Sequence, residues 1–231
     1  MLTLDHAEVR WDDWRLTADL TIAKGARVAV LGPSGAGKST LLGAIAGFQP
    51  LSGGRILWEG RDITGLPPAA RPVTMIFQDN NLFPHLTAAQ NVGLGLRPDL
   101  KLDAGQRAAV AAALERVGLG GFADRKPGRL SGGQAARVTL ARALLRHRPL
   151  MLLDEPFGAL GPALKAEMLA LVGELADETG ATLLMVSHEP EDAKALAGQV
   201  ILVIDGTVAP PVPTEEIFAN PPAALRDYLG A

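Results

Sequence analysis

A glycine-rich stretch near the start of the sequence is the first whose residues could do chemistry. Residues 32–40 read Gly-Pro-Ser-Gly-Ala-Gly-Lys-Ser-Thr and follow an apolar run at 28–31. Glycines let backbone N–H groups and a helix N-terminus close around phosphate oxygens. Lys38 would add positive charge at the terminal phosphates, and the Ser39 hydroxyl is placed to ligate Mg²⁺. Rather than a turn that only begins a helix, the sequence predicts a phosphate site made of Gly32, Pro33, Ser34, Gly35, Ala36, Gly37, Lys38, Ser39 and Thr40.

Two adjacent acids end a second apolar run. Residues 150–153 read Leu-Met-Leu-Leu, and Asp154 and Glu155 follow. Ligands gather at the carboxyl ends of parallel strands, so Asp154 is expected to hold Mg²⁺ through water. Neighbouring side chains of an extended chain point apart, which leaves Glu155 to orient or deprotonate an attacking water. The simpler alternative is that the two acids cap the N-terminus of a helix.

A pentad, Leu-Ser-Gly-Gly-Gln at residues 130–134, lies between these two stretches. The Ser131 hydroxyl, the bare backbone N–H groups of Gly132 and Gly133 and the start of a helix would form a second anion site. The simpler alternative is an N-cap with a flexible lead-in. One nucleotide does not need two helix-start phosphate sites from one chain. Both sites are explained if two copies form a symmetric pair, in which each presents its pentad, including Gln134, to the nucleotide of the other.

These residues require a scaffold that alternates strands with helices. Apolar runs at 28–31, 73–77, 150–153, 182–186 and 200–204 predict a mainly parallel sheet buried on both faces, in an α/β fold. Short strands are also predicted at 2–10, 14–22 and near 55–58. Helices are predicted at 38–46 (ended by Gly47), 104–117, 132–146 and 162–178, and the strand signal stops between about 84 and 146. Residues after 204 form a Pro-rich tail.

Composition sets the outer bounds. The chain has 231 residues, 48% of them hydrophobic, a formal net charge of −3 and no cysteine, which excludes disulfides and thiolate metal sites. Its start lacks the pattern of a signal peptide, and no apolar run approaches the ~20 residues that span a bilayer. The cations Arg142, Arg146, His147 and Arg148 are expected in the last turn of the 132–146 helix, where they suit its negative end, and not in a nucleic-acid surface.

Five stretches together resemble, in order and spacing, the ATP-binding subunit of ABC transporters. They are residues 32–40, Gln78, residues 130–134, residues 150–155 and His188, and the match extends over nearly the whole chain. The resemblance implies a P-loop ATPase with a mainly parallel core sheet, an N-terminal antiparallel β subdomain and an inserted α-helical subdomain. One ATP-binding domain would then fill residues 1–231, with the core and β subdomain at about 1–83 and 147–231 and the helical subdomain at about 84–146.

The resemblance also implies roles for individual residues. Glu155 and His188 would be catalytic, His188 as a switch histidine that touches the γ-phosphate; by itself it could be an ordinary histidine at a strand end. Gln78 would contact Mg²⁺ and nucleotide and sense the γ-phosphate. The expected metal ligands are therefore Ser39, Gln78 and Asp154.

An aromatic side chain of the N-terminal strand pair is expected to stack on adenine. Trp11 fits best, with a core or hairpin role as its alternative, and Trp14 is possible. The implied cofactors are ATP and Mg²⁺, and the implied assembly is a homodimer around two Mg-ATP.

The run at 71–96 resembles the motor subunit of bacterial thiamine importers. It lies where that family docks its integral-membrane permease, here near residues 78–96, with a solute-binding protein as an indirect partner. The resemblance implies a peripheral location on the cytoplasmic face of the bacterial inner membrane. The alternatives are motors of ferric-ion, polyamine or molybdate importers, an exporter cassette, or a soluble ABC ATPase outside transport.

Two positions depart from the family pattern. Gly161 stands where the family usually has an aspartate, and Ala135 and Ala136 stand where Arg or Lys commonly follows the pentad. Neither departure removes a primary phosphate or Mg²⁺ ligand. The sequence therefore predicts that hydrolysis survives while the ATPase rate, or the communication between the two sites, is altered.

Overall fold

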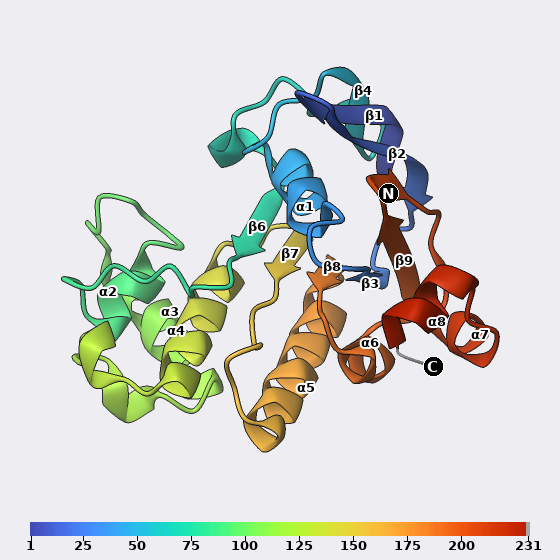
Figure 1. Cartoon of the computed structure of the whole chain (residues 1–231). Helices are drawn as coiled ribbons and strands as arrows, with labels where there is room; N and C mark the ends of the chain where they lie inside the picture. Colours follow the sequence, from blue (N-terminus) through green and yellow to red (C-terminus); the bar gives the residue numbers. More distant parts are fainter. Residues whose placement is uncertain (230–231) are drawn as a thin grey trace.

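A mixed β-sheet forms the centre of the computed structural model, which describes residues 1–229 (Figure 1). Its strands are β1 (Leu2–Trp11), β2 (Trp14–Ile22), β3 (Arg27–Leu31), β4 (Gly53–Trp58), β5 (Arg61–Asp62), β6 (Val73–Ile76), β7 (Leu150–Asp154), β8 (Thr182–Val186), β9 (Gln199–Ile204), β10 (Thr207–Val208) and β11 (Val212–Pro213). Across the sheet they are ordered β5-β4-β1-β2-β10-β9-β3-β8-β7-β6, and β11 pairs with β9. The predicted α/β class is confirmed.

The core of the sheet is parallel, as predicted. Strands β9, β3, β8, β7 and β6 all run in one direction. Successive side chains of β7 face opposite apolar clusters: Leu152 packs with helix α1 (Lys38–Ala46), and Leu153 with helix α5 (Pro162–Thr179). Figure 1 shows these helices on opposite sides of the sheet. Because both faces are buried, the strands read as continuous apolar runs.

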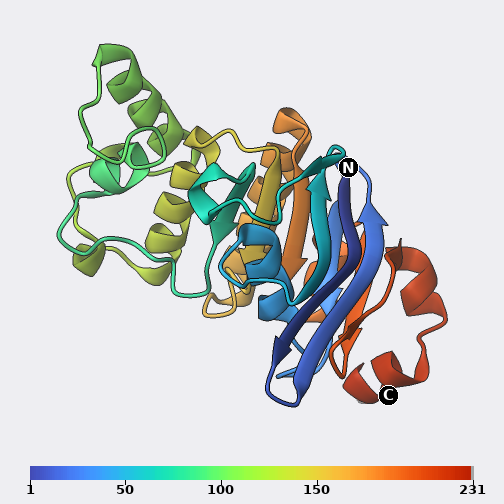
Figure 2. The ribbon, with the colours of Figure 1, turned by 90° about the horizontal axis from the view of Figure 1, so that it is seen from above.

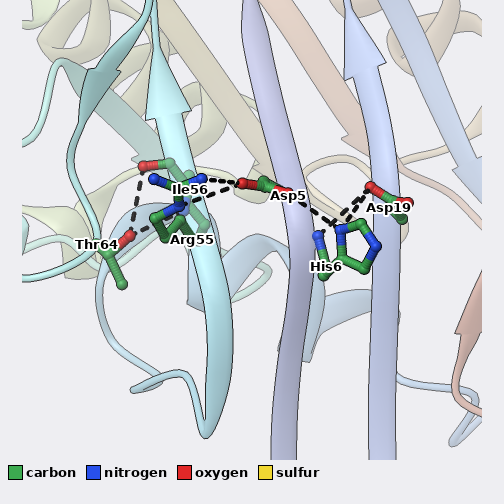
Figure 3. A network of polar contacts seen from close by, with 6 residues as sticks. All are labelled: Asp5, His6, Asp19, Arg55, Ile56 and Thr64. Atoms are coloured by element: carbon green, nitrogen blue, oxygen red, sulfur yellow. Dashed lines mark hydrogen bonds and ion pairs between the residues drawn. The ribbon is translucent and has the colours of Figure 1, made fainter.

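Strands β1, β2 and β4 form the predicted antiparallel layer. A bulge between Leu4 and Ala7 interrupts β1, and there His6 takes a left-handed backbone with φ 48°. Figure 3 shows Asp5 bonded to Arg55 of β4 and His6 reaching Asp19 of β2, so the bulge is fastened to both neighbouring strands. The Arg55 guanidinium lowers the pKa of the Asp5 carboxyl.

Helix α1 is fixed at its C-terminal end by a buried arginine. The Arg71 guanidinium, which follows the 3₁₀ turn η1 (Pro68–Ala70), donates to the carbonyls of Ala44 and Ile45 at 2.8 and 2.9 Å. These are carbonyls that the end of a helix leaves without intrahelical partners. Gly47 then ends α1 in a left-handed conformation, as the sequence predicted.

Three helices pack around a cluster of their own to one side of the sheet. They are α2 (Ala88–Gly93), α3 (Ala104–Arg116) and α4 (Gly132–Leu145), with the 3₁₀ turns η2 (Gly120–Phe122) and η3 (Pro127–Arg129) between the last two. Val92, Leu114 and Val138 are buried where they meet. Figures 1 and 2 both place this group at the end of the molecule opposite the C-terminal helices.

The residues after 204, which the sequence describes only as a Pro-rich tail, form ordered elements. Helices α7 (Thr214–Ala219) and α8 (Ala223–Leu229) follow β11, and α6 (Pro190–Leu196) precedes β9. Ile217 and Leu225 are buried in one cluster with Leu31 of β3 and Val200 of β9. The tail therefore covers the core sheet at the strand that leads into the glycine-rich loop.

Candidate nucleotide site

The glycine-rich loop joins β3 to α1, in the predicted strand–loop–helix order. At Gly32 the φ angle is 151°, and a Cβ there would lie 2.1 Å from the Val203 carbonyl oxygen. At Gly37 the φ angle is 106°, and a Cβ would lie 2.9 Å from the Trp14 ring. Both positions exclude a side chain, because the loop backbone packs closely against Val203 and Trp14.

Lys38 folds back over this loop. Its ammonium donates to the carbonyls of Gly32 and Pro33, both at 2.8 Å, and the residue is only 5% exposed. Burial lowers the pKa of the Lys38 ammonium, against the opposing effect of Glu155 and Asp154. A bound phosphate would supply the close negative charge that this buried cation lacks.

Ser39 and Asp154 meet at the ends of α1 and β7. The Ser39 hydroxyl donates to Asp154 Oδ1 at 2.9 Å. Burial, together with the neighbouring Glu155, raises the pKa of the Asp154 carboxyl although Ser39 donates to it. A half-buried carboxylate beside a hydroxyl is a set of hard oxygen donors, which fits Mg²⁺. The predicted pair is therefore brought together, and it suits the predicted metal.

Glu155 turns away from Asp154 to a different partner. Its backbone is left-handed, with φ 47°, and its N–H donates to the Val186 carbonyl of β8. The carboxylate lies 2.5 Å from His188, measured from Oε1 to Nε2. The two adjacent acids thus separate as expected, one toward Ser39 and the other toward His188.

A cavity of about 320 Å³, here called the loop cavity, lies over this group. It is lined by Trp11, Trp14, Ser34, Gly35, Gly37, Lys38, Ser39, Thr40, Glu155 and His188. The two tryptophan rings stack with their centroids 5.8 Å apart, and Trp11 is 47% exposed. Both tryptophans therefore stand at the cavity, and the choice between them as the adenine partner stays a prediction.

Gln78 lies in a second cavity of about 210 Å³, here called the inner cavity. Glu155 and His188 line it too, so both cavities share this pair. Gln78 follows β6, Glu155 follows β7 and His188 follows β8, which are three neighbouring parallel strands. The carboxyl ends of one sheet therefore gather the predicted residues, as expected for an α/β fold.

The pentad lies apart from both cavities. Ser131 caps helix α4: its hydroxyl accepts from the Gln134 N–H, and the Gln134 side chain accepts from the Ser131 N–H. Gly133 is buried, and a Cβ there would lie 2.2 Å from Leu164 Cδ2, whereas a Cβ at Gly132 would meet nothing within 4 Å. Within one chain the pentad therefore acts as the N-cap of α4. Packing against Leu164 explains why residue 133 is a glycine, but no contact explains the glycine at 132.

Comparison with known proteins identifies the family. The model of the family described as "ABC transporter" matches residues 17–158. The chain belongs to the ABC transporter family. Full-length relatives agree: it is 63% identical over 230 residues to "Thiamine import ATP-binding protein ThiQ" of Cereibacter sphaeroides, with 100% of both chains covered. It is 57% identical over 231 residues to the protein of the same name in a Ruegeria species, again with full coverage of both.

Solved structures of ABC cassettes have the same fold. The chain superimposes with a TM-score of 0.81 on the "Dimeric structure of a post-hydrolysis state of the ATP-binding cassette MJ0796 bound to ADP and Pi", at 29% identity. The superposition covers 93% of this chain and 99% of that one. This ABC cassette therefore has the predicted fold and binds ATP. Over residues 1–229 every helix is too short or too polar to cross a membrane.

Sequence reasoning missed a set of hydrogen bonds between α4 and the residues that follow Gln78. Arg142 donates to the carbonyls of Asn80 and Asn81, and the Thr139 hydroxyl donates to that of Asn80 at 2.9 Å. Asn80 and Asn81 are both left-handed, with φ 53° and 47°. Arg142 therefore fastens a strained turn of the cassette, instead of only complementing the end of its own helix.

The predicted placement of the basic residues at the end of α4 is wrong in one further respect. Helix α4 ends at Leu145 and Arg146 is its C-cap, so His147 and Arg148 lie beyond it. His147 takes a left-handed backbone with φ 44°, which breaks the helical path.

Proposed function

We propose that the chain is the ATP-hydrolysing subunit of an importer for thiamine and its phosphates. The 63% identity over the full chain to a thiamine import ATP-binding protein carries this proposal. The motor of such an importer does not touch the transported solute, so the cargo is inferred from the likeness and not from the cavities. A motor for another small solute (ferric ion, polyamine or molybdate) is the alternative.

The geometry around Glu155 suits attack of water on the γ-phosphate. With ATP along residues 32–40, Lys38 would exchange the two loop carbonyls for phosphate oxygens. A Glu155 oxygen would accept the proton of the attacking water as the new P–O bond forms and the bond to the ADP oxygen breaks. His188, already within 2.5 Å of Glu155, would hold the γ-phosphate.

We further propose that Ser39, Gln78 and Asp154 hold Mg²⁺. The 2.9 Å contact of Ser39 with Asp154 supports the first and last of these ligands. When bound, the ion supplies positive charge against the phosphate oxygens. Trp11 is proposed to stack on adenine, because its ring is about half exposed while Trp14 packs against Gly37.

The working unit is proposed to be a homodimer in which each pentad contacts the nucleotide of the other copy. Two observations support this assembly. The cassette MJ0796, which is 30% identical, has a dimeric structure. Gly132, at the start of the fourteen-residue helix α4, is exposed and a Cβ on it would meet nothing within 4 Å, so another group can approach its backbone.

A groove beside the predicted 78–96 segment is proposed to dock a helix of the permease. Two cavities share Met75, Phe77 and Arg146 there. Phe83 lines one of these cavities and Phe48 the other, and they are 48% and 53% exposed, so large apolar side chains are open to solvent. Residues 84–146 would act as the helical subdomain, and the subunit would sit on the cytoplasmic face of the inner membrane.

Reconstitution with candidate permeases tests the cargo. The chain is co-purified with a permease and the pair is placed in lipid vesicles. ATPase activity is then measured with binding proteins loaded with thiamine, ferric ion, polyamine or molybdate. Stimulation by the thiamine-loaded protein alone is expected. Stimulation by another loaded protein instead would assign the motor to that solute, and Glu155→Gln in the same vesicles is the inactive control.

A further inference from the structure

A buried lysine links helix α5 to the turn that carries His188. Lys165 lies in the first turns of α5 and is 7% exposed. Its ammonium is 2.5 Å from Glu189 Oε1 and 3.5 Å from Asp192 Oδ2. A buried ammonium is stable only with such partners, so the contact is a constraint on the positions of both elements.

The link continues to both sides of His188. The Ser187 hydroxyl donates to Asp192 Oδ2 at 2.5 Å, and the Glu189 N–H donates to the Ser187 oxygen at 3.0 Å. The residues before and after His188 are therefore both held by the group that surrounds the Lys165 ammonium. A connected and satisfied polar network of this kind makes its surroundings rigid.

Lys165 reaches the site from the inner cavity. It lines the inner cavity together with Gln78, Glu155 and His188, but it does not line the loop cavity. The Glu155–His188 pair is common to both cavities. Lys165 is thus placed to act on this pair and not on the nucleotide.

We infer that Lys165 is a positioning residue, which acts through Ser187, Glu189 and Asp192 to hold His188 within reach of Glu155. The inference rests on the proposed ATPase function and adds a residue to its machinery. Since small misplacements of a reacting group lower rates by up to ~10²-fold, loss of the link should lower kcat. Since Lys165 is not at the loop cavity, the KM for ATP should change little.

Steady-state ATPase assays of the full chain test this. Lys165→Met should lower kcat at least about tenfold and leave KM within about twofold. Lys165→Arg, which keeps a cation, should retain most of the rate. The matched control is Lys194→Met on α6, which removes an exposed ion pair with Glu191 and should leave both constants unchanged.

A double substitution separates positioning from a general weakening of the fold. If Lys165 acts through His188, then Lys165→Met should add little to the loss already caused by His188→Ala. Independent, multiplying losses would overturn the inference, as would an unchanged kcat in Lys165→Met. Nucleotide binding is followed by the fluorescence of Trp11 and Trp14, which line the loop cavity.

Asp192→Asn keeps the inference testable if Lys165→Met does not fold. It preserves shape while removing the charge beside the ammonium, and it should lower kcat without raising KM. A rate equal to that of the unmodified chain would contradict the inference. If the unmodified chain hydrolyses ATP and Glu155→Gln does not, an unchanged rate in Asp192→Asn rejects only the role of Lys165 and leaves the proposed ATPase function in place. If the unmodified chain has no ATPase activity, the proposed function itself fails.

Discussion

Replacing Gly161 by aspartate should make the chain more stable. Gly161 is the N-cap of the eighteen-residue helix α5, its backbone is extended (φ −65°, ψ 157°), and it offers no side-chain cap. A Cβ at this position would meet nothing within 4 Å and the residue is exposed, so a side chain can begin here without a clash. Its carboxylate could then accept from the free N–H groups of the first turn.

The magnitude follows from three small terms. An aspartate cap is a few tenths of a kcal/mol better than glycine, its charge at a helix N-terminus adds ~0.3–1 kcal/mol, and loss of glycine from the unfolded chain adds ~0.4–1 kcal/mol. The sum is about 1–2 kcal/mol. For a chain of this length that raises Tm by roughly 2–8 °C.

Thermal unfolding at low ionic strength, with Gly161→Asn as the matched control, is the assay. Asparagine supplies the cap and the chain-entropy term without the charge, so its Tm should lie between those of the glycine and aspartate chains. An aspartate variant that melts at or below the Tm of the unmodified chain would refute this account of the helix start. ATPase rate and Hill coefficient are measured on the same samples. If both are unchanged, Gly161 does not explain any altered communication between the sites.

Four further predictions concern the site and the pentad. Asp154→Asn should raise Tm at pH 7. Burial raises the pKa of the Asp154 carboxyl, so the folded chain loses stability as pH rises and this carboxyl ionises. The increase in Tm should vanish below the ordinary pKa of 3.8, where the carboxyl is protonated in the folded and the unfolded chain. A lower Tm at pH 7 would contradict this. Glu155→Gln should accumulate an ATP-bound dimer, which light scattering would detect. Ser131→Arg should stop hydrolysis while a single copy still binds ATP. Loss of that binding would mean that the pentad contacts the nucleotide of its own chain. Gly133→Ala should lower Tm by about 2–4 °C, because a Cβ there would meet Leu164 and overpacking costs ~1 kcal/mol, whereas Gly132→Ala should not. Equal Tm values for these two variants would count against the packing explanation.

The sequence was sufficient wherever local signals bracket an element. Helix α1 spans Lys38–Ala46 as predicted, because glycines stand on both sides of an apolar run. Strand β8 spans Thr182–Val186 as predicted, because a strand buried on both faces appears in the sequence as a nearly continuous apolar run. The strand-end argument predicted Asp154 and Glu155, whereas Gln78 and His188 came from the family resemblance; in the structure all of them lie at one edge because parallel strands end together.

Contacts between distant parts of the chain could not be read in this way. The segment that forms α7 and α8 is short and interrupted by prolines, so neither helix shows a clear hydrophobic periodicity in the sequence. Arg142 has no local reason to reach the Asn80 and Asn81 carbonyls, about sixty residues away. Lys165 looks like an ordinary surface lysine of an amphipathic helix, and only the fold brings Asp192 next to it.

The left-handed backbone of Glu155 has an evolutionary consequence. At φ 47° a residue with a side chain is less favourable than glycine by roughly 1 kcal/mol or more. Two selective pressures therefore conflict at this position. The backbone conformation favours glycine, but glycine has no side chain that could accept a proton. Lineages that lost ATP hydrolysis could gain stability by placing glycine there. A glutamate at this position therefore serves turnover at a cost to the stability of the fold.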